Sequence, residues 1–278
     1  MSEDMPHARE WKLKDGQLHR MSMVDNGFGR PLATSTDGSV LVNFESPPNR
    51  CVIRRREQNE WRTVRTISST IEPISGALRR DQGRLVIGSI TGEIEFWDLE
   101  AKSPRKLWAN QTPQNQSVVQ LHFAMNDRLL VSQLVSNAVV QRISDTGLEP
   151  VLTLPTNYDR TLDVAPNGGS FAVATRTEAS VWSLTFDPPQ LINTLSASQD
   201  VSPRSVNYSP DGRQLAVAYD NGQILLHDLE SGTVARTLQL PGQIRHVLFT
   251  TDNRHLITAN GNGTIYVLRL APPKETPK

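Results

Sequence analysis

One sequence pattern occurs six times along the chain. It consists of a small polar turn, a short apolar strand, a second tight turn, and a strand of alternating apolar and polar residues that ends in an aliphatic residue. The second strand of each repeat starts at an apolar anchor, and the anchors recur every 41 to 45 residues. They are Val40, Leu85, Leu129, Phe171, Leu215 and Leu256. A period in the low forties built from strands and turns is typical of a radial repeat architecture. It indicates one domain for the 278 residues.

A second set of aliphatic residues supports the same register. Leu99, Ile143, Leu229 and Leu270 each lie 14 residues after an anchor. No stretch keeps a 3.6-residue apolar period for three turns, so helix is nearly absent from the expected structure. The sequence therefore predicts an all-β fold of four-stranded antiparallel sheets.

The fifth repeat shows the expected turns most clearly. Ser209-Pro210-Asp211-Gly212 has the residues of a tight inner turn, because Pro210 fixes φ and Gly212 tolerates unusual backbone angles. Asn221-Gly222 predicts a two-residue hairpin turn in which both residues have positive φ. Thr91-Gly92 and Asn262-Gly263 repeat that hairpin signal.

These residues resemble the WD40-repeat family, whose fold is a β-propeller. Trp97-Asp98 ends a third strand as the family's name dipeptide does, and His227-Asp228 stands at the same place in the fifth repeat. The family's Gly-His pair is missing from every repeat, so its His-to-Trp hydrogen-bond network is not expected. The end of the sixth repeat, residues 259–270, looks like repeats that terminate multidomain bacterial propeller proteins.

The resemblance implies a β-propeller over residues 8–270, with a disordered N-terminus at 1–7 and a disordered tail at 271–278. Six repeats give two ways to build the ring. In the first, residues 17–22 pair with the C-terminal strands and close six blades. In the second, residues 10–13 are the third strand of an incomplete seventh blade, and the chain is a segment of a longer protein.

Composition excludes several classes of function. Lys plus Arg and Asp plus Glu both number 29, and the resulting net charge of zero argues against nucleic acid and anionic membranes as partners. A secretory signal and an apolar run long enough to span a bilayer are both missing from the sequence. The single cysteine, Cys51, fits a reducing compartment. We therefore expect a cytoplasmic protein.

Signatures of catalysis are also missing. The histidines show no metal-ligand spacing, Gly88 to Gly92 is not a nucleophile elbow, and Gly27-Phe28-Gly29 lacks the third glycine of a dinucleotide site. The sequence predicts no enzyme activity, no cofactor and no metal.

Arginine supplies the candidate binding site. Arg160, Arg204 and Arg245 lie four residues before Val164, Tyr208 and Phe249, at one position of three successive repeats. Strand alternation places each arginine on the same side as the apolar residues two and four later. First strands line a propeller's central channel, so the three guanidinium groups could clamp an acidic or phosphorylated peptide. Alternatively, each arginine covers the end of an apolar stack and points outward.

A second basic group lies between residues 50 and 84, where nine arginines face four acids. It either steers an acidic partner or forms the solvated outer edge of a blade. The tryptophans are expected in core packing. Together these features predict a non-catalytic scaffold that binds a protein or peptide on a propeller face. The alternative is a regulatory or sensor domain of a larger bacterial signalling enzyme such as a protein kinase.

Overall fold

The computed structural model describes residues 11–14, 17–20, 29–46, 49–58, 60–156, 161–195 and 201–270. These residues form twenty-five strands and one short 3-10 helix, η1 (Pro113–Asn115). The expected all-β fold is confirmed. The expected disordered ends at 1–7 and 271–278 lie outside the described residues and stay predictions. Among the described residues, no helix has the length and apolar character needed to cross a membrane.

Antiparallel sheets of consecutive strands make up the fold. Five sheets have four strands, one has three and one has two. The first three four-stranded sheets are β3 (Arg30–Thr34), β4 (Val40–Glu45), β5 (Arg50–Glu57) and β6 (Glu60–Ser68); β7 (Pro73–Leu78), β8 (Arg84–Ser89), β9 (Glu93–Asp98) and β10 (Arg105–Gln111); and β11 (Val118–Ala124), β12 (Leu129–Leu134), β13 (Asn137–Ile143) and β14 (Leu148–Pro155). The later sheets are β15 (Leu162–Val164), β16 (Ser170–Ala174), β17 (Ala179–Ser183) and β18 (Gln190–Leu195); β19 (Pro203–Tyr208), β20 (Gln214–Tyr219), β21 (Gln223–Asp228) and β22 (Val234–Gln239); and β23 (Ile244–Phe249), β24 (His255–Asn260) and β25 (Ile265–Arg269).

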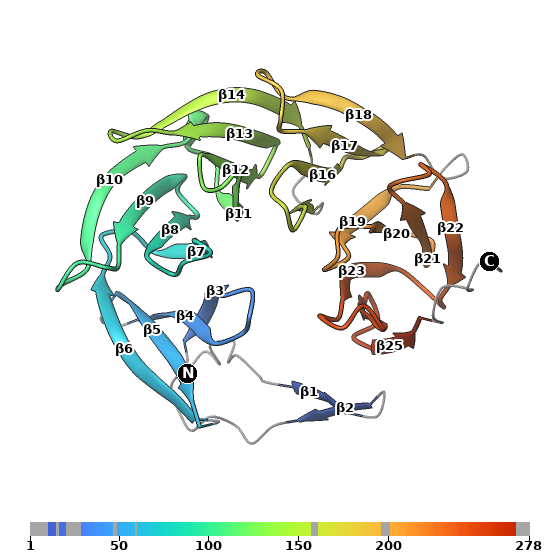
Figure 1. Ribbon diagram of the computed structural model, residues 1–278, viewed down its shortest axis with the longest axis horizontal. Coiled ribbons are helices and arrows are strands. Elements are labelled where there is room, and N and C mark those ends of the chain that lie inside the picture. Colours follow the sequence, from blue (N-terminus) through green and yellow to red (C-terminus); the bar gives the residue numbers. More distant parts are fainter. Residues whose placement is uncertain are drawn as a thin grey trace, which may run out of the picture. The chain divides into compact units, whose positions relative to one another are not determined.

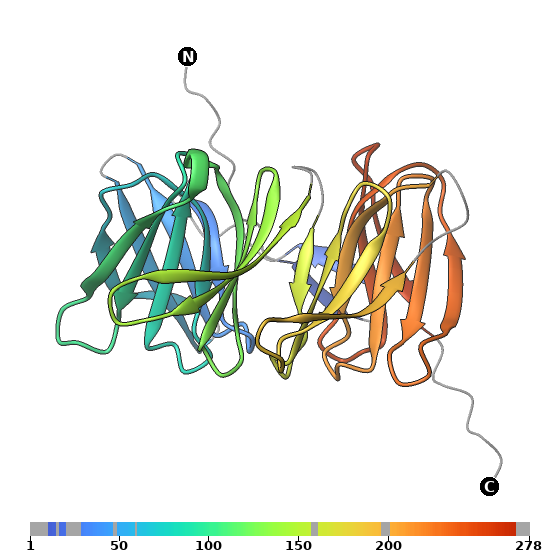
Figure 2. The ribbon, with the colours of Figure 1, turned by 90° about the horizontal axis from the view of Figure 1, so that it is seen from above.

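The chain divides into two compact units, the N-terminal unit with the sheets from β3 to β14 and the C-terminal unit with the sheets from β15 to β25. Within each unit the first strand of every sheet lies innermost, and the fourth strand of each four-stranded sheet lies on the outside (Figure 1). Seen from the perpendicular direction, the connecting turns of each unit gather at two opposite ends (Figure 2). The sheets are therefore the blades of a β-propeller.

Apolar side chains fill the space between neighbouring blades of a unit. Leu85 and Ile87 of β8 are fully buried against Val42 and Phe44 of β4. In the next interface, the rings of Phe96 in β9 and Phe123 in β11 have centroids 6.1 Å apart. Second strands such as β8 and β20 are buried on both faces over most of their length, whereas the outer strand β22 is mostly exposed. This burial supplies the main favourable term for folding.

A single backbone hydrogen bond recurs in all six repeats and confirms the period. In the second repeat Leu99 donates its N–H to the carbonyl of Gly83 at 2.9 Å. The equivalent donors in the other repeats are Arg56, Ile143, Leu184, Leu229 and Leu270. In the third repeat the acceptor is Arg128, so the residue equivalent to Leu85 is Leu130. Two of the expected anchors, Val40 and Leu129, were therefore wrong by one residue. In the first repeat the acceptor is Ser39, so the residue equivalent to Leu85 is Leu41. In the third repeat, three consecutive residues with positive φ (Met125 to Asp127) tighten the turn.

The inner turn is built as expected and stiffened by side chains. Ser209 donates its hydroxyl to Asp211 at 2.6 Å and accepts the N–H of Gln214 at 2.8 Å. Asp211 also accepts the N–H of Arg213 at 3.1 Å, and Gly212 takes φ +71°. Ser35-Asp37 and Thr250-Asp252 repeat these contacts in the first and sixth repeats. The turn signal in the sequence therefore corresponds to a specific hydrogen-bond network.

The hairpin turns differ from expectation. At Asn221-Gly222 only Gly222 has positive φ, and Gly222 donates its N–H to Tyr219 at 3.2 Å. The Asn221 side chain accepts the N–H of Gln223 at 3.0 Å, which holds Asn221 in an ordinary conformation. The expected turn with positive φ at both residues was therefore wrong. The glycine is still required, because a Cβ there would lie 2.2 Å from the carbonyl oxygen of Leu240.

The N-terminal strands pair with each other. Strand β1 (Trp11–Lys14) and strand β2 (Gln17–Arg20) form the two-stranded sheet. The expected pairing of residues 17–22 with the C-terminal strands is not formed by the described part of this segment, since β2 has β1 as its neighbour and β25 ends its own sheet. The incomplete seventh blade, with residues 10–13 as its third strand, stays a prediction.

Candidate partner-binding surface

The first strand of five blades carries a β-bulge at the same position. In β19, Pro203 pairs with Tyr219 and Ser205 with Ala218, so Arg204 is the extra residue. The extra residues of the five strands are Leu32, Ile74, Val119, Arg204 and Arg245. A bulge interrupts the alternation of side chains and redirects the extra one. The sequence spacing therefore correctly placed Arg204 and Arg245 at equivalent positions. Because each is the extra residue of a bulge, simple alternation does not fix the side of the strand on which its side chain lies.

The three candidate arginines differ in their surroundings. Arg204 is half-buried, and with the Gln243 amide turned so that its oxygen faces the guanidinium, Nη2 and Nε donate to it at 3.0 and 3.2 Å. Gln243 directly precedes β23, so this fork bridges two blades of the C-terminal unit. Arg245 is exposed, and no hydrogen bond or ion pair joins it to another residue in the described part of the chain. Arg160 lies outside the described residues.

His246, next to Arg245, does not add charge to this surface. Burial and the neighbouring guanidinium of Arg245 lower the pKa of His246 below its ordinary value of 6.5. The imidazole is thus neutral at pH 7, and the positive charge at the start of β19 and β23 belongs to arginine.

Short polar side chains tie the neighbouring first strands of the C-terminal unit together. The hydroxyl of Thr161, just before β15, accepts the N–H of Val206 in β19 at 2.9 Å. One repeat later, the hydroxyl of Ser205 accepts the N–H of Val247 in β23 at 3.2 Å. These contacts fix the spacing of the strands that carry the arginines.

A second pair of contacts runs deeper along the same strands. Asp163 Oδ2 accepts the N–H of Tyr208 at 2.8 Å, and Asn207 Oδ1 accepts the N–H of Phe249 at 2.8 Å. Asn207 also donates from Nδ2 to Asp163 at 2.9 Å. Burial raises the pKa of Asp163 to about 6, although the N–H donors favour its charged form. Sequence analysis missed these links; polar residues recurring in otherwise apolar first strands were the available signal.

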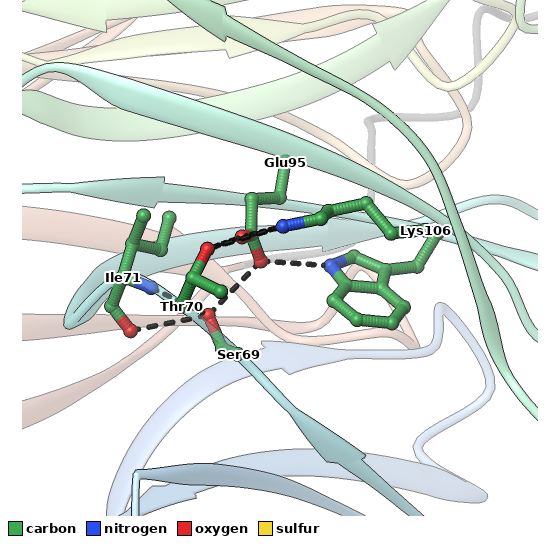
Figure 3. Close-up of polar contacts among 6 residues, drawn as sticks. Ser69, Thr70, Ile71, Glu95 and Lys106 are labelled. Carbon is green, nitrogen blue, oxygen red and sulfur yellow. Dashed lines mark hydrogen bonds and ion pairs between the residues drawn. The ribbon is translucent and has the colours of Figure 1, made fainter.

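The N-terminal unit contains a buried carboxylate that sequence analysis also missed. Glu95 of β9 is fully buried, and Figure 3 shows its two oxygens surrounded by donors. Oε1 accepts from Lys106 at 2.9 Å and Thr70 at 2.5 Å, and Oε2 accepts from Ser69 and the Trp97 indole at 3.0 Å each. Burial would raise the pKa of Glu95, but these four donors outweigh it and hold the pKa below its ordinary value. This cluster replaces the family network that the sequence lacks.

His227 fills the slot of Trp97 without its hydrogen bond. It pairs with Leu215 as Trp97 pairs with Leu85. The side chain is buried, Nε2 has no partner among the described residues, and burial lowers the pKa of His227. Its expected role as a strand residue in the position of Trp97 agrees with the structure. In the described ranges, no group of three His, Cys, Asp or Glu side chains could hold a metal ion.

The basic group between residues 50 and 84 is largely paired with acids. Glu45 contacts Arg50 and Arg54 at 2.7 and 2.6 Å. Arg79 contacts Asp127 at 2.9 Å, and Arg84 contacts Asp98 at 2.5 Å. All three of these acids lie outside residues 50–84: Glu45, Asp98 and Asp127. The net charge counted within that range therefore overstates the positive charge of this surface. Of this group Arg62 and Arg65 lie on the outer strand β6, and the Arg54 and Glu45 side chains are only 13% and 15% exposed, so the expected solvated outer edge describes part of the group.

Comparisons with known proteins agree with this architecture. The model of a family described as the anaphase-promoting complex subunit 4 WD40 domain matches residues 169–252. A U3 small nucleolar RNA-associated protein 18 homolog from Arabidopsis thaliana is 24% identical over 168 residues. That match covers 58% of this chain and 30% of the relative, so the chain spans less than a third of the relative's length.

Solved propeller structures are similar over most of the chain. The β-propeller domain of Cps50 (Swd1) from Myceliophteria thermophila has a TM-score of 0.67 at 11% identity, covering 86% of this chain and 82% of that one. The periplasmic gluconolactonase PpgL of Pseudomonas aeruginosa has a TM-score of 0.71 at 15% identity, covering 95% and 88%. At these identities the likeness concerns the fold alone.

The fold and these similarities define a β-propeller protein. The match of a WD40-domain family model to residues 169–252 confirms the resemblance to the WD40-repeat family that Trp97-Asp98 and Ser209 to Gly212 first indicated. The further likeness to bacterial propeller proteins stays a prediction.

Proposed function

We propose that this chain is a non-catalytic scaffold that binds a protein or peptide at the ends of its first strands in the C-terminal unit. The observation that carries the proposal is the placement of Arg204 and Arg245 at equivalent bulges of neighbouring strands. The strands below them are fixed by Thr161 and Ser205, so the two guanidinium groups are held on a stiff support. Rigid supports lower the entropy lost on binding.

The proposed ligand is acidic. Guanidinium forks bind carboxylate and phosphate groups in two-pronged geometry, and Arg245 has its donors available to solvent. Arg204 uses one edge of its fork on Gln243, which orients the rest of the group. Arg160, which has the same place in the preceding repeat, is proposed as the third member of the site.

The test is site-specific crosslinking on the full chain. A photoreactive amino acid replaces Arg245 in one variant and Arg236, exposed on the outer strand β22, in the control variant. We expect protein partners to be captured from position 245 and not from 236. Equal capture from both positions, or turnover of a small-molecule substrate by the purified chain, would contradict the proposal.

We propose that the ligand is a protein and not nucleic acid. The sequence next to Arg204 and Arg245 contains no run of aromatic residues on which successive bases could stack. The plant relative is named for an RNA association, so the alternative has its own test. A single-stranded RNA that bound Arg245-dependently and more tightly than acidic peptides would exclude a peptide ligand.

The second candidate function is a regulatory or sensor domain of a larger bacterial signalling enzyme such as a protein kinase, acting in the cytoplasm. The pairing of β1 with β2 as a third and fourth strand favours it, because two preceding strands would complete that blade. Sequencing the reading frame upstream of Met1 tests this candidate. Upstream codons for two strands and a catalytic domain would support it, and an untranslated upstream region would reject it.

A further inference from the structure

Strand β25 is the third strand of its blade and has no fourth strand beside it. In the five four-stranded blades the third strand is hydrogen-bonded on both sides, whereas β25 has β24 as its one neighbour among the described strands. Strand β24 pairs Thr258 with Tyr266, and Leu270 donates its N–H to Arg254. Because antiparallel pairing alternates, the N–H groups of Ile265 and Val267 point away from β24.

Because β25 has no fourth strand beside it in the described part of the chain, Ile265 is exposed at a position that is buried in the five four-stranded blades. Ile265 pairs with Ala259 as Ile224 pairs with Ala218 in the preceding blade. Ile265 is 52% exposed, whereas its five equivalents are 0 to 1% exposed. Those equivalents are Cys51, Ile94, Ala138, Ala179 and Ile224. An open edge with exposed aliphatic side chains is a template for strand addition.

The described chain does not supply the missing strand. Strand β2 is paired with β1, and the segment that follows β25, residues 271–278, contains three prolines. Proline has no N–H to give to a sheet, so this segment is a poor fourth strand. A two-fold pairing of β25 with a second copy centred on Val267 would set Arg269 directly opposite Ile265, which pairs charge with an aliphatic side chain.

We infer that the edge of β25 binds an extended segment of a partner protein as the fourth strand of this blade. The other blades define the chemistry of that segment. In three of them the outer strand places a large aliphatic residue opposite the position of Ile265: Ile67, Leu195 and Leu238. The partner segment is therefore an antiparallel strand with an aliphatic residue at this place, bound by main-chain hydrogen bonds and one apolar pocket. This surface is separate from the arginine surface, so either proposal can fail alone.

Amide hydrogen exchange and peptide binding on the full chain test the inference. The probe is a peptide with the sequence of residues 233–240, which includes β22 and its Leu238. We expect fast exchange of the Ile265 and Val267 amides in the free protein, and exchange slowed by about tenfold when the peptide is bound. Ile265→Asp should abolish binding, whereas Ile90→Asp, at a site 59% exposed in the N-terminal unit, should leave it unchanged. A peptide with proline in place of the Leu238 equivalent should not bind.

Three results would overturn the inference. Slow exchange of both amides in dilute protein without peptide means that the chain's own segment covers the edge. Protection that rises with protein concentration means that a second copy does. Unchanged exchange at saturating peptide concentration means that the edge does not accept a strand.

Discussion

The indole Nε1 of Trp97 donates a hydrogen bond to Oε2 of Glu95, two residues earlier on the same strand, at 3.0 Å. The same relationship recurs in β17, where Trp182 donates to the hydroxyl of Ser180 at 3.0 Å. Residues two apart share one face of a strand, so an acceptor at this spacing satisfies the indole locally. These two blades meet the hydrogen-bond demand of tryptophan without the family's histidine.

Glu95→Ala is expected to destabilise the protein strongly. The change leaves Trp97 and Thr70 without their acceptor and removes the carboxylate partner of Lys106, and breaking a buried ion pair costs about 3 kcal/mol. Urea denaturation at pH 7 measures the free energy of unfolding. Since the pKa of Glu95 is lowered, the wild-type advantage should shrink as the pH falls below the ordinary value of 4.5.

The matched control is Glu149→Ala. Glu149 is 63% exposed and lies 3.8 Å from Arg142, so its loss should change the free energy of unfolding by at most about 0.5 kcal/mol. Equal effects of the two substitutions would show that the Glu95 cluster does not stabilise the N-terminal unit.

Asp163 should give the stability curve a distinctive pH dependence. Its pKa is raised to about 6 in the folded chain, against an ordinary value of 3.8, so the folded state binds more protons than the unfolded state between these values. Stability from this residue should therefore fall as the pH rises from 4 to 6, by at most about 1.4 kcal/mol per pH unit. Denaturation curves of wild type and Asp163→Asn across this range measure it. Parallel curves for the two proteins would refute the raised pKa.

Two glycines with positive φ should respond differently to alanine. Gly232 has φ +70° and open space around it, so Gly232→Ala should cost only backbone strain, about 1 kcal/mol. Gly222 has φ +86°, and an added Cβ meets the carbonyl oxygens of Leu240 and Gly242 at 2.2 and 2.5 Å. Gly222→Ala should therefore lower the midpoint temperature of unfolding more than Gly232→Ala does. Thermal unfolding of both variants checks this, and equal shifts would contradict the tight hairpin geometry.

The propeller could be predicted from the sequence because the residue types within each turn are enough to indicate that turn. Ser209 and Asp211 sit in a turn whose hydrogen bonds involve only neighbouring residues, so residue type and spacing are sufficient. The anchor at Leu129 and the hairpin at Asn221 were wrong for a similar local reason. Backbone angles at one or two residues shifted the register or the turn type, and residue types alone do not fix those angles.

The site was less predictable because its contacts join residues that lie far apart in the sequence. The spacing of Arg204 and Arg245 was visible, but the bulges that redirect them appear only when strand pairing is known. Asp163 reaches Tyr208 across 45 residues, and Ser69 reaches Glu95 across 26. Which polar groups meet at such distances depends on blade packing, which the sequence pattern does not specify.

The most direct test of the account is the affinity of the full chain for a fluorescent glutamate-rich peptide, measured by anisotropy at several salt concentrations. The Arg204→Ala, Arg245→Ala double variant should bind at least about tenfold more weakly, and wild-type affinity should fall with salt. The Arg236→Ala control, which removes the same charge from an outer strand, should bind as wild type does. Equal affinity of the wild type and a folded double variant would contradict the claim that these first strands form the partner-binding surface.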